Sequence, residues 1–320
     1  MNSIPLTDDF LRRVMSYYKT HTTNDIIPMW RNVLSAFTPL QRAIYADDIH
    51  EVRNILSNIY NGVMLWGIDF RYDAIEDENG YRQRTLKAIQ NLANDCMMPC
   101  EEVTDEIIST LESKCGCQLN CPIYPNRPVI QIGNRSIPCR FVTSVHLLYK
   151  LRQHINQPKE VLEIGAGAGY IAYLFRIYYP QVKYHIIDLP MISVFQSCVY
   201  ATMVGEDNIW FNGEPKNSDA KLYIYSPNDT HNISDKSIDF CVNHNSFPEI
   251  PQSIQIQYLN EIRRVLVDKG FFYSVNWEPE EKKDQTPTYV SCKKLSFVRS
   301  HRALFMGEDG YSYYEELYKP

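Results

Sequence analysis

The sequence lacks an excess of positive charge. Its 320 residues include 32 lysines and arginines against 38 aspartates and glutamates, which gives a formal net charge of −6 at pH 7. A protein that binds nucleic acid normally presents a basic face to the phosphate backbone. The composition therefore argues against a nucleic acid partner, although a few local charges could still hold a nucleotide-linked substrate.

The sequence also lacks a long apolar run. It contains no stretch of about 18 apolar residues, the length that a membrane-spanning helix requires, and we therefore expect no membrane span. The first nine residues are acidic and have no apolar core, unlike a secretory signal peptide. We therefore expect a cytoplasmic protein in which the nine cysteines are reduced thiols.

Five of the cysteines fall within one short span, at Cys96, Cys100, Cys115, Cys117 and Cys121. Zinc ligands usually come in pairs with two to four residues between them, so the spacing allows a structural metal site. The first pair, however, is followed directly by a predicted helix and not by a zinc knuckle. Buried or idle thiols are the favoured interpretation, and we expect no metal.

Glycine is scarce, at 13 residues, yet three glycines fall within five positions. Gly165, Gly167 and Gly169 alternate with two alanines, after an apolar segment (161–164) and before another (171–179). The first segment is typical of a buried strand and the second of a helix. A strand, a glycine turn and a helix start bring bare backbone N–H groups close to a ligand.

The residues around this turn distinguish between two classes of cofactor. A dinucleotide site would have a third glycine where this chain has Tyr170. Glu163, two residues before the first glycine, would repel a pyrophosphate and attract the ammonium group of an amino acid. The pattern Glu-x-Gly-x-Gly-x-Gly resembles the first motif of class I methyltransferases, which bind S-adenosylmethionine. The resemblance implies cofactor contacts at Glu163, Gly165, Ala166, Gly167, Gly169 and Tyr170.

A second apolar run (182–187) ends in Asp188, roughly 20 residues beyond the glycine turn. An acid at this point can accept hydrogen bonds from both ribose hydroxyls of a nucleoside, whichever cofactor class is bound. Asp188-Leu189-Pro190 is similar to the Asp-Leu-Pro of many small-molecule O-methyltransferases, so we expect Leu189 to contact the cofactor too. Arg140 could hold the cofactor's carboxylate, but a solvated arginine is slightly favoured.

The expected organisation has three parts. Residues 1–121 are predicted to be mostly helical, including one helix from Arg42 to Tyr60, and to cover the substrate, form a homodimer or serve as a structural collar. Residues 122–136, with three prolines, are predicted to be an irregular linker. Residues 137–320 resemble a class I methyltransferase domain, an α/β Rossmann-like fold whose seven-stranded sheet has helices on both faces. We expect its third strand at 209–211, an extra strand at 222–225, and a final antiparallel hairpin at 295–298 and 311–318.

Three further segments resemble a bacterial family described as sugar O-methyltransferases. They are Asn243-His-Asn-Ser-Phe-Pro-Glu249, Tyr258-Leu-Asn-Glu-Ile262 and Gly270-Phe-Phe-Tyr-Ser-Val-Asn276. The family also has a helical N-terminal region of this size, although it tends to have methionine where this chain has Ile250. The resemblance implies methyl transfer from S-adenosylmethionine to a hydroxyl of a nucleotide sugar, a glycan end or a glycosylated metabolite.

A sugar hydroxyl is a poor nucleophile near neutrality, so a general base helps, and histidine is the natural choice. His244 is the candidate base, although it could merely cap a loop. Glu249 could orient it or bind sugar hydroxyls, and Asn243 could contact both the reacting groups and the cofactor. Asn245, Asn276 and Trp277 are the expected substrate contacts. Magnesium-assisted deprotonation is the rival mechanism, but it needs more carboxylates than Glu249 and Glu278 supply.

Other functions stay open at this point. The acceptor could be a small molecule other than a sugar, such as a phenol or a carboxylate, because the Asp-Leu-Pro segment fits that equally well. The chain could also be a catalytically silent methyltransferase fold that serves as a binding subunit, although Glu163, the glycines and Asp188 argue against this. A dehydrogenase is the least favoured interpretation, because of Glu163 and Tyr170.

Overall fold

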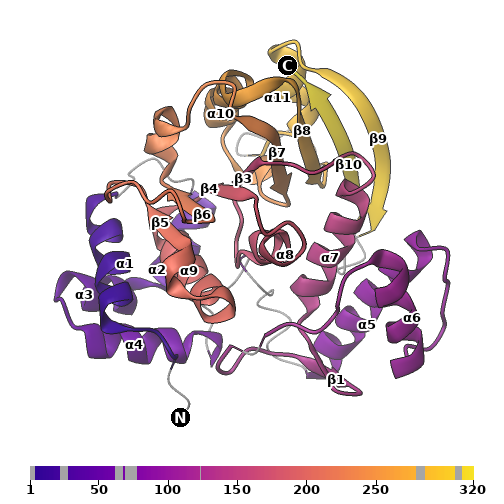
Figure 1. Cartoon of the computed structure of the whole chain (residues 1–320), viewed down its shortest axis with the longest axis horizontal. Coiled ribbons are helices and arrows are strands. Elements are labelled where there is room, and N and C mark those ends of the chain that lie inside the picture. Colours follow the sequence, from indigo (N-terminus) through magenta and orange to yellow (C-terminus); the bar gives the residue numbers. More distant parts are fainter. Residues whose placement is uncertain are drawn as a thin grey trace.

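An eight-stranded mixed sheet forms the centre of the protein (Figure 1). The computed structural model describes residues 4–21, 28–61, 68, 78–122, 124–278, 285–306 and 312–320. The strand order is β5-β6-β4-β3-β7-β8-β10-β9. Neighbouring strands from β5 to β8 are parallel, whereas β10 runs antiparallel to both β8 and β9. The strands are β3 (Glu160–Ile164), β4 (Lys183–Ile187), β5 (Ile209–Phe211), β6 (Leu222–Tyr225), β7 (Ile238–His244), β8 (Leu266–Asn276), β9 (Val298–Met306) and β10 (Ser312–Lys319).

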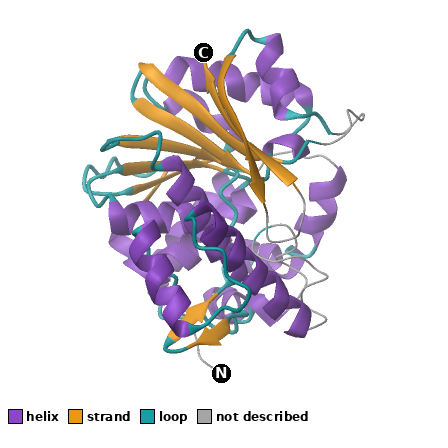
Figure 2. Cartoon of the chain, turned by 90° about the vertical axis from the view of Figure 1, so that its right-hand side faces the viewer, coloured by secondary structure: helices purple, strands orange, loops and turns teal. Residues whose placement is uncertain are grey.

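Helices pack on both faces of this sheet (Figure 2). Alternate residues of β7 belong to different hydrophobic clusters, with Phe240 and Val242 in one and Cys241 in the other, as expected for a strand buried on both faces. The first cluster includes α7 (Cys139–Leu151), α8 (Tyr170–Tyr178) and α9 (Pro190–Val204), and the second includes α10 (Gln252–Val265) and α11 (Thr288–Lys294). This architecture confirms the fold class predicted from the sequence.

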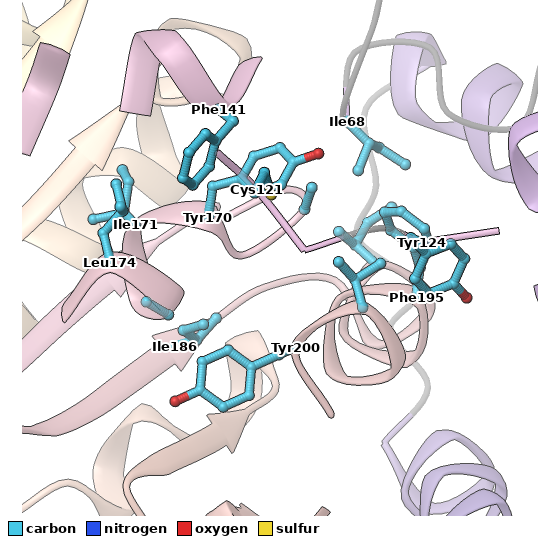
Figure 3. Close-up of a cluster of buried hydrophobic side chains, with 14 of the residues drawn as sticks. Ile68, Cys121, Tyr124, Phe141, Tyr170, Ile171, Leu174, Ile186, Phe195 and Tyr200 are labelled. Atoms are coloured by element: carbon cyan, nitrogen blue, oxygen red, sulfur yellow. The ribbon is translucent and has the colours of Figure 1, made fainter. Parts of the chain in front are cut away.

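The N-terminal part is helical, as predicted, and shares the first hydrophobic cluster with the sheet. It contains α1 (Asp8–Thr20), α2 (Pro28–Ser35), α3 (Thr38–Tyr45), α4 (Ile49–Ser57), α5 (Glu78–Asp95) and α6 (Asp105–Cys115). Ile68 from this part belongs to the same buried cluster as Tyr124, Tyr170 of α8 and Phe195 of α9 (Figure 3). None of the described helices is long and apolar enough to cross a membrane.

The predicted helix from Arg42 to Tyr60 is wrong, because the chain turns between α3 and α4. Asp47 adopts a left-handed backbone conformation with φ 57°. Asp48 then accepts a hydrogen bond from the backbone N–H of Glu51 at 3.0 Å and caps the second helix. An aspartate cap satisfies a backbone donor that the first turn of a helix leaves unpaired, so it favours the start of a second helix over the continuation of the first.

The sheet has eight strands instead of the seven expected, because the extra strand predicted at 222–225 belongs to it. The two segments β5 and β6 also occupy each other's expected positions. The segment expected to be extra, β6, pairs with β4 and is second from the edge of the sheet, whereas β5 pairs with β6 alone and lies at the edge. Helix α1 covers this edge, where the Tyr17 and Phe211 ring centroids lie 5.2 Å apart. Covering an edge strand protects its unpaired backbone groups from pairing with another chain.

Two other predictions need correction. The linker at 122–136 is not irregular throughout, because β1 (Ile130–Ile132) and β2 (Arg135–Ile137) form a short antiparallel hairpin. The strand expected at 295–298 begins only at Val298, and α11, which the sequence analysis missed, precedes it. The strand expected at 311–318 is present as β10.

Candidate functional site

The strand order reverses at β3, which has β4 on one side and β7 on the other. Loops that leave such a pair of strands diverge and open a crevice at the carboxyl ends of the strands, where open α/β sheets bind ligands. A cavity of about 290 Å³ lies at this point. Its walls come from the loops after β3, β4 and β7, from the starts of α7 and α10, and from Trp30 and Ile68 of the N-terminal part.

The glycine turn has a backbone that glycine alone adopts without strain. Gly165, Gly167 and Gly169 have φ values of 71°, 56° and 77°. A Cβ atom at residue 167 would lie 2.8 Å from the carbonyl oxygen of Ile68, and one at residue 165 would overlap the Ser246 side chain. Of the glycine-turn residues expected to contact the cofactor, Gly165, Ala166, Gly167 and Tyr170 line the cavity, whereas Gly169 is outside its wall. The glycines therefore allow both the turn and the close approach of neighbouring segments.

Two acids with raised pKa values face the cavity. Glu163 is only 1% exposed, and burial raises its pKa to about 8, although its hydrogen bond from the Tyr184 hydroxyl at 2.8 Å acts in the opposite direction. Enclosure by the protein raises the pKa of Asp188 to about 7, against the hydrogen bonds that it accepts from Leu189 and Gly167 N–H groups. A cation or several hydrogen-bond donors in this cavity would favour the charged form of both acids.

The cavity wall continues on either side of these acids. Leu189 lies beside Asp188, and Pro227 and Asn228 come from the segment after β6. Arg140 and Ser144, from the first turns of α7, also line the cavity. Arg140, for which a solvated position was the slightly favoured expectation, lies half-buried in the cavity wall.

The end of β7 brings three of the predicted acceptor-side residues to the cavity. His244, Asn245 and Glu249 all line it, together with Ser246 between them. The imidazole of His244 contacts Phe305 edge to face, with centroids 6.2 Å apart. One imidazole and one carboxyl group in a single wall provide a base for proton abstraction and an acceptor for substrate hydroxyls.

Asn243 occupies a different position from the one that the sequence predicted. Its side chain is fully buried and does not line the cavity. Its amide donates to the carbonyl of Ile164 at 2.7 Å and to the Ser246 hydroxyl at 2.6 Å, and its oxygen accepts from Phe247 N–H at 3.1 Å. Asn243 therefore fixes the floor under the site, and direct contact with cofactor or acceptor is not supported.

The predicted substrate contacts at Asn276 and Trp277 need the same correction. Asn276 is buried below the site and donates to the side-chain oxygen of Asn243 at 2.8 Å. Trp277 packs half-buried against the main hydrophobic cluster. Neither residue lines the cavity. The sequence indicated which end of β8 they occupy, but it did not indicate which way their side chains point.

Several cavity residues were missed by sequence reasoning. Trp30 and Ile68 carry no motif, and their sequence distance from the glycine turn hides their proximity. Ser246 lies within the segment from Asn243 to Glu249, so its position could have been inferred. Ile250 and Pro251, just before α10, also line the cavity, and α10 adds Ile254, Gln257, Tyr258 and Glu261 on successive turns of one helix face.

The cysteines remain separate thiols. All nine are free, and Cys115 donates a weak hydrogen bond to the carbonyl of Cys117 at 3.4 Å. In the part of the chain that the structure describes, they contribute to no cluster of three potential metal ligands. The zinc arrangement that their spacing allows is therefore not formed by these residues.

Comparisons with known proteins found structural likenesses at low sequence identity. No protein-family model matches the sequence, and no curated protein sequence matches it significantly. Among solved structures, a SAM-dependent methyltransferase from Aquifex aeolicus is 14% identical (TM-score 0.37; 53% of this chain and 87% of that chain). A mitomycin 7-O-methyltransferase is 8% identical (TM-score 0.40; 57% of each chain).

A third solved structure is the 1,6-didemethyltoxoflavin N1-methyltransferase of Burkholderia thailandensis with bound 1,6-didemethyltoxoflavin and S-adenosylhomocysteine. It is 16% identical, with a TM-score of 0.38 over 53% of this chain and 74% of that chain. All three likenesses have TM-scores below 0.5, so they do not bear on the substrate or chemistry of this chain.

Proposed function

We propose that this protein is an S-adenosylmethionine-dependent O-methyltransferase that acts on a sugar hydroxyl. The observation that carries the proposal is the position of Glu163 and Asp188, two enclosed acids on either side of a glycine turn in one cavity. The charged forms of these acids need a cation or hydrogen-bond donors as partners. A nucleoside that also bears an amino acid supplies both, because its ribose hydroxyls donate hydrogen bonds and its ammonium group is a cation.

The donors and acceptors of the cavity fit such a cofactor. Asp188 accepts the ribose hydroxyls, Glu163 accepts the ammonium group, and Arg140 is the cation in the wall for the carboxylate. Pro227 and Asn228 follow β6, the strand that pairs with β4, and would contact the base of the nucleoside. When bound, S-adenosylmethionine supplies an electrophilic methyl group on a sulfonium. The chain's own part is to hold donor and acceptor in line, which supplies much of the rate.

The acceptor side of the cavity supports a hydroxylated substrate. His244 takes the proton from the acceptor hydroxyl, and Glu249 and Asn245 hydrogen-bond neighbouring hydroxyls. Trp30 provides an aromatic face of the kind on which a sugar ring packs. The N-terminal helices, which place Trp30 there, would then act as a substrate cover. The cytoplasmic location and the homodimer expected from the sequence stay predictions.

A binding experiment with a matched variant tests the cofactor. S-adenosylmethionine and S-adenosylhomocysteine should both raise the melting temperature of the wild-type protein, whereas NAD should not. Asp188→Asn should weaken the binding of both adenosyl ligands, because an amide accepts hydrogen bonds from the ribose hydroxyls less strongly than a carboxylate. The variant Asp219→Asn, at an exposed acid outside the cavity, should bind them as the wild type does. A shift with NAD alone would overturn the assignment.

A second candidate acceptor is a small molecule other than a sugar. It is favoured by the apolar side chains Ile68, Ile250 and Ile254 in the cavity wall. A screen for transfer of labelled methyl groups to nucleotide sugars, glycosides and phenols distinguishes the two acceptor classes. Bound cofactor without transfer to any acceptor would instead favour a silent binding subunit.

A further inference from the structure

A cluster of potential metal ligands lies outside the cavity, where the end of α7 meets the C-terminal hairpin. His154 follows α7, His301 is on β9 and Glu315 is on β10. One ligand atom from each lies within 4.8 Å of the other two, and no other such group of three occurs among the described residues. None of the three residues lines the cavity described above.

The backbone places these side chains together. His301 is paired with Leu317 across the hairpin, so Glu315, two residues before Leu317, is its diagonal neighbour on the same face of the sheet. Nε2 of His154 lies 3.3 Å from Oε1 of Glu315, and Nε2 of His301 lies 3.7 Å from the same oxygen. Ligands at 2.0–2.1 Å from a tetrahedral zinc ion are separated by roughly 3.3 Å. The observed spacings are close to that value.

The polar atoms of the cluster are incompletely paired. The side chain of Glu315 is 1% exposed, and its Oε2 lies 3.2 Å from the ammonium group of Lys150. Nε2 of His301, in contrast, is buried without a hydrogen-bond partner. Buried polar groups are otherwise almost always hydrogen-bonded, so Nε2 of His301 indicates a missing partner.

The charges around the cluster favour an added cation. Lys150 lies 3.2 Å from Oε2 of Glu315 and 3.3 Å from Asp95, so its single positive charge is shared by two carboxylates. With neutral histidines, this group carries one net negative charge in a largely buried position. A divalent ion held by Oε1 would leave Oε2 to Lys150. The side chains of His154 and His301 are 22% and 36% exposed, which leaves a path for entry.

We propose that His154, His301 and Glu315 form a binding site for a zinc-type divalent cation. Two imidazole nitrogens and one carboxylate oxygen are a donor set that zinc prefers, and water would complete the tetrahedron. The ion would join the C-terminal end of α7 to β9 and β10. Because the other end of α7 carries Arg140 and Ser144, the ion would brace a helix that forms part of the cavity wall. The proposal does not depend on the methyl-transfer assignment.

Metal titration of the full-length protein tests the site. After treatment with a chelator and its removal, calorimetry at pH 7.5 should show one zinc ion per chain, and zinc should raise the melting temperature. Cobalt should give weak visible bands without the intense absorption of a thiolate–cobalt bond. No zinc binding, or a thiolate band, would overturn the proposal, the second result because it would place the metal on the cysteines.

Matched variants identify the ligands. His301→Gln should weaken zinc binding by at least about tenfold, since loss of a ligand costs no less than loss of a supporting contact. His50→Gln, the same change at an exposed histidine of α4, should bind zinc as the wild type does. His154→Gln provides a second ligand variant on another element. Zinc affinity unchanged in both ligand variants would show that the ion binds elsewhere.

Lys150→Met gives a result in the opposite direction. Removing the ammonium group leaves Asp95 and Glu315 without their shared cation, so the metal-free variant should melt at a lower temperature than the wild type. Zinc affinity should rise, and zinc should raise the melting temperature by more than in the wild type. If the histidines only donate protons to Glu315 and no metal binds, zinc will restore no stability to this variant, which would also overturn the proposal.

Discussion

The side-chain amide of Asn243 donates a hydrogen bond to the main-chain carbonyl of Ile164 at 2.7 Å. This contact joins the carboxyl ends of β7 and β3, the two strands between which the sheet reverses its order. The same amide reaches the hydroxyl of Ser246, which fills the space left by the missing side chain of Gly165. Asn243 thus positions the glycine turn after β3 and the loop after β7 relative to each other.

Replacing Asn243 by aspartate should therefore destabilise the protein by about 1–3 kcal/mol, the cost of leaving buried hydrogen-bonding groups unpaired. The change keeps the shape but removes both donors and places a carboxylate beside the Ile164 carbonyl. Cofactor affinity should fall as well, because the turn loses its support. Asn245→Asp, the same change two residues later at the cavity surface, should leave the melting temperature nearly unchanged. Equal melting temperatures for the two variants would contradict the role assigned to Asn243.

The raised pKa of Glu163 predicts how stability depends on pH. Burial raises this pKa from 4.5 to about 8, so between these values the folded protein binds more protons than the unfolded chain. The free energy of unfolding of the ligand-free protein should therefore fall as the pH rises through this window, by at most about 1.4 kcal/mol per pH unit for one group. Asp188 adds to the fall between pH 3.8 and about 7.

Denaturant unfolding measured from pH 5 to 8 checks this expectation. Glu163→Gln removes the titrating group and should make the free energy of unfolding depend less steeply on pH. It should also weaken the binding of S-adenosylmethionine, because the carboxylate proposed to pair with the ammonium group is lost. Glu51→Gln, at an exposed position of α4, should retain the wild-type slope. A Glu163→Gln profile as steep as that of the wild type would show that Glu163 is already charged in the folded protein.

The part of the cavity wall at the ends of β3 and β4 could be predicted because its signals are local. The glycines, Glu163 and Asp188 lie at the ends of adjacent parallel strands, so sequence spacing alone places them at one edge. Asn243 and Asn276 show the limit of this reasoning. Strand periodicity placed both residues near the rim but could not distinguish a side chain in the cavity from one buried below it.

Contacts between segments that are far apart in the sequence could not be predicted from local sequence patterns. Trp30 reaches the cavity through packing of the N-terminal helices, and no spacing rule connects it to Gly167. His154, His301 and Glu315 meet because a helix end packs against the last hairpin. The exchange of β5 and β6 has the same origin. Both segments are short and apolar, and only the pairing of β6 with β4 decides which of them lies inside the sheet and which at its edge.

Helix α1 is attached to the edge strand β5 by Arg13. Its guanidinium group donates to both oxygens of Glu214, at 2.7 and 2.9 Å, and to the carbonyl of Ile209 at 2.7 Å. Hydrogen bonds to charged groups contribute about 1.5–3 kcal/mol when buried, and this pair is partly exposed. Arg13→Met should therefore lower the free energy of unfolding by about 1–2 kcal/mol.

The neighbouring residue provides the control for this prediction. Arg12 pairs with Asp9 at 3.3 Å, but their side chains are 63% and 94% exposed, so Arg12→Met should change stability very little. Denaturant unfolding of both variants measures the difference. Equal effects would mean that the contact between α1 and β5 does not depend on the Arg13–Glu214 pair.

His244, the proposed general base, stands in the cavity wall at the end of β7. If its imidazole takes the proton from the acceptor hydroxyl, His244→Gln should lower kcat by about two to four orders of magnitude, the usual contribution of a general base. Affinity for S-adenosylmethionine should change little, since this side chain faces the acceptor. His231→Gln, at an exposed histidine, should keep wild-type kcat on the acceptor found by the methyl-transfer screen. Full turnover by His244→Gln would assign proton removal to another group, and Glu249 would then be the first to replace, because it is the other proton acceptor in that wall.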